Sequence, residues 1–226
     1  MRALIASFEP QKDEATNASS EAVSRLPERV GTVEISKISL PATCDAALST
    51  LTERLRAGWP DILLIVAEAI GRTDLALERA ALNFDEASAL DENGDPVPGQ
   101  PVIPGGPPAY LTNLPLRAFR DELRRDGLPA VISTSAGSGI GNHVYYGALH
   151  LATGGPTQNG PAKGDGDTAG TSILLVRTPI LPLQAARLDR MPSMAAETVI
   201  AALAVLLEAI GQHRGGGGSF MDAAPA

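Results

Sequence analysis

Carboxylates near the expected central strand are the first candidates for chemistry. Glu68 follows the continuous apolar run at residues 62–66, which is typical of a strand covered on both faces. Sheet proteins of the α/β class place ligands at the carboxyl ends of such strands. Glu68 and Glu78 could therefore act as a general acid and a general base. The alternative is that Glu68 forms an ion pair with Arg72 or Arg177 and only balances charge.

Serine, histidine and cysteine side chains offer less chemistry. Ser135 and Ser138 lie in a glycine-rich turn, but no histidine is placed to activate a serine nucleophile. The segment Gly137-Ser138-Gly139 lacks the Lys-Ser/Thr pair of a phosphate loop. The three histidines lack metal-ligand spacing, and the single cysteine, Cys44, excludes an internal disulfide and a cysteine-rich zinc site. We therefore expect no metal and no cofactor.

The bulk composition excludes several classes of function. The chain has 226 residues, of which 44% are hydrophobic, enough for one domain with a sizeable core. A net charge of -8 argues against nucleic-acid binding, because the phosphate backbone would repel an acidic chain. No apolar stretch reaches the ~20 residues of a membrane span, and no signal peptide is visible. We expect a cytoplasmic protein with a small-molecule ligand and no nucleic-acid or membrane partner.

Strand patterns alternate with helix patterns along the chain. We expect strands at residues 3–8, 33–40, 62–66, 75–84, 130–133 and 173–176, and helices at 19–26, 44–57, 116–126, 142–151 and 193–212. Residues 91–109 are expected to form a long surface loop. This order predicts an α/β fold, a three-layer α/β/α sandwich with a mostly parallel twisted sheet. Residues 1–212 form the single domain, with a flexible insertion at 153–171 and a Gly-rich disordered tail at 213–226.

Short motifs in one consistent order extend over most of the chain. They are Phe8-Glu9-Pro10 with Asn17 and Ser19, Gly71-Arg72 with Glu78-Arg79-Ala80 and Asn83, Asp91 to Pro115, Ser133 to Tyr146, Thr178 to Pro182, and Pro192-Ser193-Met194. In these motifs the chain resembles the pyroglutamyl peptidase I (pyrrolidone-carboxylate peptidase) family. The resemblance implies the fold of that family, whose members are thiol hydrolases. They remove an N-terminal pyroglutamyl residue from a peptide with a Cys, a His and a Glu.

The resemblance also assigns the three catalytic positions. The Glu position is Glu78, the Cys position is Gly141 and the His position is Arg177. Glycine cannot form an acyl-enzyme. Arginine stays protonated and cannot replace an imidazole as a general base. Cys44 is expected at a strand-to-helix junction elsewhere and cannot supply the missing thiol.

Further departures from the family fall on its substrate pocket. The family's arginine near the acyl oxygen corresponds to Ser88, and the phenylalanine and two glycines that help line the lactam pocket correspond to Gln11, Lys12 and Asp13. By the same resemblance, residues 141–143 open a helix, whose free N–H groups and dipole favour an anion. With the fixed cation of Arg177 close by, these residues predict a pocket for a carboxylate or a similar anion.

The expected site and three functional hypotheses follow. Catalytic residues are Glu78 and Glu68, and substrate-binding residues are Phe8, Gln11, Arg72, Ser138, Gly141, Asn142, His143 and Arg177. His143 is expected mainly to orient its loop. The first hypothesis is a diverged family member that binds, and possibly transforms by thiol-independent acid/base chemistry, a small anionic or lactam-type molecule. The second is a pseudoenzyme that acts as a binding module, and the third is a residual pyroglutamyl peptidase. The family implies a possible homo-oligomer.

Overall fold

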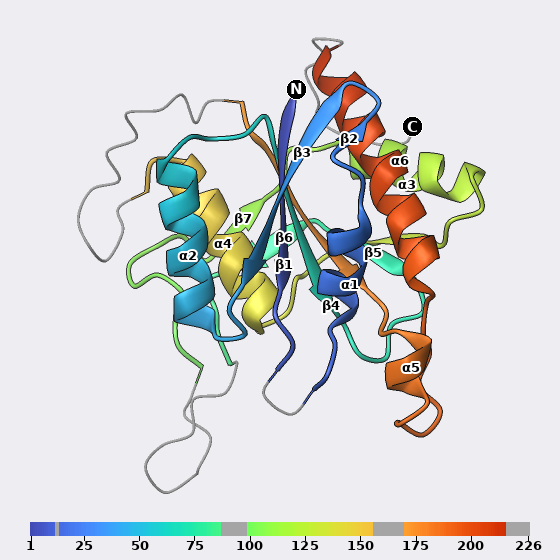
Figure 1. The fold of residues 1–226 in the computed structure, drawn as a ribbon. Helices are drawn as coiled ribbons and strands as arrows, with labels where there is room; N and C mark the ends of the chain where they lie inside the picture. The colour runs from blue at the N-terminus through green and yellow to red at the C-terminus, as the bar shows by residue number, and fades with distance from the viewer. Residues whose placement is uncertain (12–13, 87–98, 156–169, 216–226) are drawn as a thin grey trace, which may run out of the picture.

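Seven strands form a mixed sheet at the centre of the structure, a computed structural model that describes residues 1–11, 14–86, 99–155 and 170–215 (Figure 1). The strand order is β2-β3-β1-β4-β9-β5-β8. These strands are β1 (Arg2–Phe8), β2 (Arg29–Val30), β3 (Val33–Leu40), β4 (Ile62–Glu68), β5 (Leu75–Glu78), β8 (Ala130–Ser133) and β9 (Ser172–Thr178). Neighbours among β3, β1, β4 and β9 are parallel, β5 is antiparallel to β9 and parallel to β8, and β2 is antiparallel to β3. The prediction of a mostly parallel sheet is confirmed.

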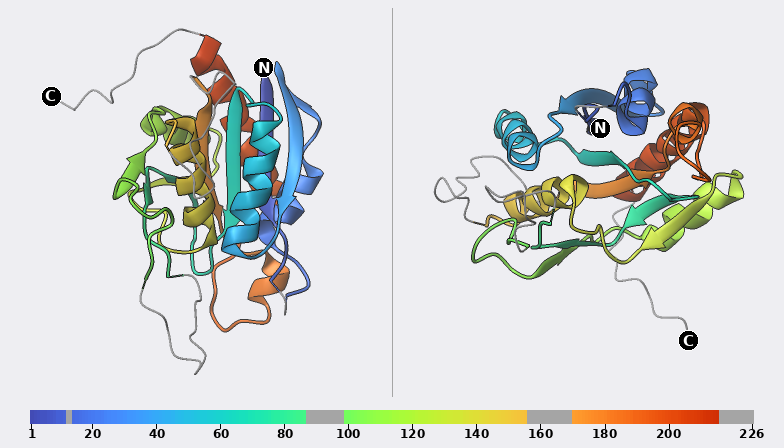
Figure 2. Two further views of the ribbon diagram at one scale, coloured as in Figure 1. Left: turned by 90° about the vertical axis from the view of Figure 1, so that its left-hand side faces the viewer. Right: turned by 90° about the horizontal axis from the view of Figure 1, so that it is seen from below.

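Helices cover both faces of this sheet. They are α1 (Ala18–Arg25), α2 (Cys44–Arg56), α3 (Leu116–Arg125), α4 (Ile140–Ala152), α5 (Pro182–Ala185) and α6 (Ala196–Gly215). Figure 1 and the right-hand view of Figure 2 show α2 and α4 on one side of the sheet and α1, α3 and α6 on the other. A small second sheet, β6 (Ala80–Leu82) with β7 (Ala109–Leu111), packs against α4. This arrangement confirms the three-layer sandwich.

The alternation of side chains along β4 explains the two cores. Ile62, Leu64 and Val66 belong to the core under α1, α3 and α6. Leu63 and Ile65 belong to the core under α2 and α4. All five side chains are fully buried, because a central strand of a doubly covered sheet has no exposed face. Burial of each such side chain contributes about 1.5–3 kcal/mol to folding.

Helix α6 is a core helix of this sandwich. Its length and composition alone would allow it to cross a membrane, but half of its apolar window is buried within the structure. Val199, Leu203 and Leu206 pack in the core against the sheet. The helix begins at Ala196, slightly later than expected, and continues to Gly215, so the predicted tail is wrong for residues 213–215.

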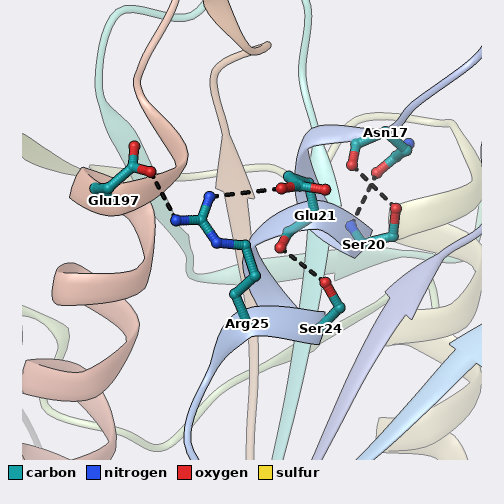
Figure 3. Close-up of polar contacts among 6 residues, drawn as sticks. All are labelled: Asn17, Ser20, Glu21, Ser24, Arg25 and Glu197. Carbon is teal, nitrogen blue, oxygen red and sulfur yellow. Dashed lines mark hydrogen bonds and ion pairs between the residues drawn. The ribbon is translucent and has the colours of Figure 1, made fainter.

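Helix α1 is held at both ends by polar contacts, which Figure 3 shows. At its start, Oδ1 of Asn17 accepts hydrogen bonds from the backbone N–H groups of Ser19 and Ser20, at 2.9 and 3.4 Å. Near its end, Arg25 forms ion pairs with Glu21, at 3.5 Å, and with Glu197 of α6, at 2.6 Å. The side-chain cap satisfies N–H groups that a helix leaves without partners. The exposed ion pair joins α1 to the start of α6.

One predicted strand, residues 75–84, is divided between two sheets. Its first part forms β5 in the large sheet, and its second part forms β6 in the small one. The backbone N–H of Arg79 donates to the carbonyl of Ser133, and the carbonyl of Arg79 accepts from the N–H of Thr112. The chain therefore changes partners at this residue. The apolar pattern did not indicate the change, because β5 and most of β6 are buried.

The structure describes the predicted surface loop at residues 91–109 from residue 99 onward. The prediction is right for most of these residues, which are exposed and form no helix or strand before Ala109, and it is wrong for two of them. Val102 and Ile103 are buried in the core under α2 and α4. The side chain of Asn83 holds this segment, since it accepts from the N–H of Ile103 at 2.8 Å and donates to its carbonyl at 2.9 Å. Residues 91–98 and most of the predicted insertion lie outside the described residues.

Candidate ligand-binding site

The carboxyl ends of β1, β4 and β9 border a cavity of about 730 Å³. Phe8 ends β1, Glu68 ends β4, and Arg177 is the penultimate residue of β9; all three line the cavity. Gly141 of α4 and Cys44 of α2 line it as well. In Figure 1, β1, β3 and β4 point toward the end of the sandwich at which α4 begins. The structure therefore has a cavity at the edge where the sequence predicts a ligand.

Two opposite charges interact in the interior beside this cavity. Glu78 is fully buried, and its Oε1 accepts a hydrogen bond from Nη2 of Arg72 at 3.3 Å. Burial raises the pKa of Glu78, whereas the Ser133 side chain and the charges of Arg72 and Arg177 oppose that shift. Burial also lowers the pKa of Arg177, and the charge of Glu78 opposes it. Burial thus favours the neutral form of Glu78, while the two guanidinium groups favour its carboxylate.

Some buried polar atoms near the ends of β5 and β9 have unused hydrogen-bonding capacity. Oε2 of Glu78, Nε of Arg177 and Oγ1 of Thr178 have no hydrogen-bond partner within the described ranges. A buried polar atom without a partner costs about 1–3 kcal/mol, so such atoms are uncommon in the absence of a specific reason. Nε of Arg177, a donor, therefore remains available at the cavity wall, and Oε2 of Glu78, an acceptor, remains available behind it.

Glu68 makes contacts that the sequence did not indicate. Its Oε2 accepts a hydrogen bond from the backbone N–H of Ala18 at 2.7 Å and another from Nε2 of Gln184 at 2.7 Å. The carboxylate thus connects the end of β4 to the start of α1 and to α5. Among the described residues, no ion pair joins Glu68 to Arg72 or Arg177, so the charge-balancing alternative is wrong. A role for Glu68 as an acid or base stays a prediction.

Residue 141 lies in the first turn of α4, close to the end of β4. A Cβ atom on Gly141 would lie 3.1 Å from Cβ of Ala67 and 3.7 Å from Cδ2 of Leu175. The Arg177 guanidinium lies near the segment that leads into α4, because its Nη1 would be 3.4 Å from a Cβ atom on Gly137. The structure therefore places positions 141 and 177 at one cavity, as the resemblance implies.

Two predicted binding residues instead make contacts within the protein. The Asn142 side chain accepts from the N–H of Leu82 at 2.8 Å and donates to its carbonyl at 2.9 Å. It thereby fastens α4 to β6. The Ser138 hydroxyl donates to Oε2 of Glu86 at 3.2 Å. Neither side chain is among the described residues that line the 730 Å³ cavity.

Cys44 lies in the cavity wall, contrary to the expectation that it stands elsewhere. It is the first residue of α2, which follows β3, and β3 is parallel to β1, so both strands end at the same edge. Burial raises the pKa of the thiol to about 12, and the Asp85 and Asp45 carboxylates add to this shift. Asp85 also lies 2.6 Å from Nδ1 of His143. The strand-to-helix junction was predicted correctly; what the prediction lacked was the direction of the strand.

The structure brings together only part of the predicted set. Those that share the cavity are Phe8, Gln11, Glu68, Gly141 and Arg177. Glu78 and Arg72 contact each other in the interior beside it. His143 lines a neighbouring cavity of about 390 Å³ with residues of α2 and α4. The sequence reasoning missed Cys44 and Asp85, which line the main cavity.

The family model described as pyroglutamyl peptidase matches residues 1–213. The chain belongs to the pyroglutamyl peptidase family. It is 37% identical over 201 residues to the pyrrolidone-carboxylate peptidase of Cupriavidus necator, covering 88% of each chain. It is 38% identical over 203 residues to that of Erwinia tasmaniensis, covering 89% of each.

A solved structure extends this relationship to the fold. Pyroglutamyl peptidase I from Bacillus amyloliquefaciens is 28% identical and superposes with a TM-score of 0.81, covering 94% of this chain and 96% of that one. The resemblance to the pyroglutamyl peptidase family and the predicted fold are therefore confirmed. The assignment of Gly141 and Arg177 to the thiol and imidazole positions of the family rests on the sequence motifs and stays a prediction.

Proposed function

We propose that this member of the pyroglutamyl peptidase family binds a small carboxylate or lactam-type molecule in the cavity at the ends of β1, β4 and β9, without a thiol nucleophile at residue 141. The observation that carries the proposal is the environment of Arg177. Its side chain lines the cavity, and its buried Nε has no hydrogen-bond partner in the described part of the chain. A guanidinium group binds carboxylates through charge-assisted hydrogen bonds.

The buried carboxyl group of Glu78 complements this cation. A lactam has both an N–H donor and a carbonyl acceptor, so it needs an acceptor and a donor from the protein. Oε2 of Glu78 and Nε of Arg177 are such a pair, and neither has a partner among the described residues. Glu78 is fully buried and contacts the ligand only if the wall between them adjusts. Burial raises the pKa of Glu78, which makes its protonated form more accessible than that of an exposed carboxyl group.

Relatives suggest the first ligand to test. The curated relatives bear the name pyrrolidone-carboxylate peptidase. Pyrrolidone carboxylate combines a lactam ring with a carboxylate. The carboxylate matches the cation of Arg177, and the lactam matches the acceptor of Glu78 and the donor of Arg177. We infer that the free acid, which can pair with Arg177, binds better than the neutral 2-pyrrolidone. Proline has the carboxylate but no lactam carbonyl, so a comparison with proline tests the contribution of the lactam group.

Thermal unfolding with and without these compounds tests the proposal. A ligand at 100 times its Kd stabilises the folded protein by about 2.7 kcal/mol. Free pyrrolidone carboxylate is expected to raise the Tm, and Arg177→Met is expected to abolish that rise. Arg187→Met, which changes an exposed arginine outside the cavity lining, is the matched control and keeps the rise. Equal shifts in both variants contradict the proposal.

Turnover of a pyroglutamyl reporter separates the proposal from an ordinary peptidase. We expect no hydrolysis that depends on a thiol. Hydrolysis that alkylation or Cys44→Ser abolishes would show that this chain uses a thiol after all. Slow turnover that Glu78→Gln abolishes without loss of ligand binding would indicate acid/base catalysis. Binding without turnover would identify the binding-module alternative.

A further inference from the structure

Three side chains with metal-ligating atoms lie close together in the wall between the 730 Å³ cavity and the 390 Å³ cavity. They are Cys44 at the start of α2, Asp85 after β6 and His143 in α4. One ligand atom from each lies within 4.8 Å of the others. Nδ1 of His143 is 2.6 Å from Oδ2 of Asp85. Three separate segments of the chain thus bring a sulfur, a nitrogen and an oxygen donor together.

The position of this cluster gives it access to solvent and to the ligand site. Cys44 and Asp85 line the 730 Å³ cavity, and His143 lines the 390 Å³ cavity. Asp45 lines both, and its exposed carboxylate lies 4.0 Å from Nε2 of His143. The His143 side chain is only 6% exposed. An ion can therefore enter from either cavity and reach a donor set that is mostly fixed by the fold.

We propose that Cys44, Asp85 and His143 form a binding site for a divalent transition-metal ion of the Zn²⁺ type. Sulfur, imidazole and carboxylate donors are the ligands that this ion takes in proteins. Hard cations such as Mg²⁺ prefer oxygen-only sites. The proposal goes beyond the ligand site at Arg177 and is independent of it.

The dimensions of the cluster fit such an ion after a small movement. Ligand atoms about 2.0–2.3 Å from a tetrahedral ion lie about 3.3–3.8 Å apart. The donors already lie within 4.8 Å of one another, so no separation has to close by more than about 1.5 Å. The 2.6 Å contact between His143 and Asp85 opens to the same range. Water completes the coordination, because Asp45 lies at Nε2 of His143, on the other side of the ring from Nδ1.

The charge around the sulfur favours a cation over a nucleophile. A carboxylate oxygen of Asp85 lies within 4.8 Å of the Cys44 sulfur, and Asp45 is the next residue of the chain. Two negative groups repel a free thiolate, which a nucleophilic role requires. A divalent cation between the same groups neutralises them and stabilises the bound thiolate. Three protein ligands also leave a coordination position for water.

Zinc and cobalt binding to the full chain tests this site. Protein stripped with a chelator is titrated with Zn²⁺ against a chromophoric chelator, and with Co²⁺ in an absorption spectrometer. We expect one tightly bound equivalent, with a thiolate-to-cobalt charge-transfer band and intense visible bands of tetrahedral Co²⁺. Cys44→Ser is expected to remove the charge-transfer band and to weaken Zn²⁺ binding by about 100-fold or more, because even loss of an outer partner costs 10–100-fold.

Control variants separate the site from general metal binding. His143→Gln and Asp85→Asn are expected to weaken binding like Cys44→Ser, and His213→Gln on α6 leaves it unchanged. Circular dichroism and thermal unfolding check that each variant folds. If His143→Gln does not fold, Cys44→Ser tests the site on its own, because Cys44 is only half-buried and its substitution perturbs the core less. Failure to bind one equivalent, absence of the thiolate band, or equal affinity in Cys44→Ser overturns the proposal. Loss of pyrrolidone-carboxylate binding in Arg177→Met does not bear on it.

Discussion

Removal of Arg177 should destabilise the protein in a way that depends on pH. The charge of its guanidinium group acts on the carboxyl group of Glu78, which is fully buried and contacts Arg72 at 3.3 Å. Breaking a buried pair by removing one partner costs about 3–5 kcal/mol when the remaining charge has no other partner. Because Arg72 remains, we expect Arg177→Met to cost about 1–3 kcal/mol at pH 8.

The pH dependence follows from the direction of the Glu78 shift. Its pKa is raised in the folded protein, so its neutral form contributes stability at low pH that is lost as the pH rises through the folded pKa. Arg177 opposes that shift, and without it the pKa of Glu78 rises further. The destabilisation by Arg177→Met should therefore grow between about pH 5 and pH 8, where the carboxylate must ionise without its partner.

Urea unfolding at several pH values, followed by circular dichroism, measures this effect. The double variant Glu78→Gln/Arg177→Met should recover much of the lost stability, because no charge remains to be buried. Arg187→Met, which changes an exposed arginine just after α5, should show no comparable pH dependence. A cost that is the same at pH 5 and pH 8, or that the double variant does not reduce, would refute the reasoning.

Two further predictions concern packing and capping. Gly106→Ala should destabilise the protein by about 1–3 kcal/mol, since its Cβ would lie 2.5 Å from the hydroxyl oxygen of the fully buried Tyr146 and 3.1 Å from the backbone carbonyl oxygen of Ile103. Gly139→Ala, with open space around its Cβ, is the control, and equal urea midpoints for the two variants contradict the packing argument. Asn17→Ala should cost about 0.5–2 kcal/mol in the same assay, because it removes the cap of α1. Ser24→Ala, inside that helix, should cost clearly less, and the reverse order would count against the cap.

The layers of the fold could be predicted because they depend on local patterns. The apolar run in β4 requires cover on both faces, and the alternation of such strands with amphipathic helices requires helices on both sides. The path through Arg79 could not be predicted in this way. The residues on both sides are buried and, apart from Glu78, apolar, yet they belong to different sheets. Only the partners Ser133 and Thr112, far along the chain, determine where the chain turns.

In the candidate site, too, local patterns predicted some residues, whereas contacts between distant segments could not be predicted. The end of the apolar run in β4 placed Glu68 at the cavity, and the resemblance to the family placed Arg177 there. The contact of Glu68 with Gln184 needed α5, which the sequence did not indicate. The cluster of Cys44 with Asp85 needed the direction of β3 and the position of the chain after β6. Spacing along a sequence finds ligands within one element, and these donors come from separate ones.

The place of β9 in the sheet has a consequence for synthesis of the chain. This strand lies between β4 and β5, and Ile62 pairs with Ser172 across a long stretch of intervening sequence. Until the ribosome has released residues beyond β9, β4 has an open edge, which is a template for aggregation. A nascent or truncated chain that ends before β9 is therefore a client for chaperones. Arg177 reaches the cavity only when β9 pairs with β4.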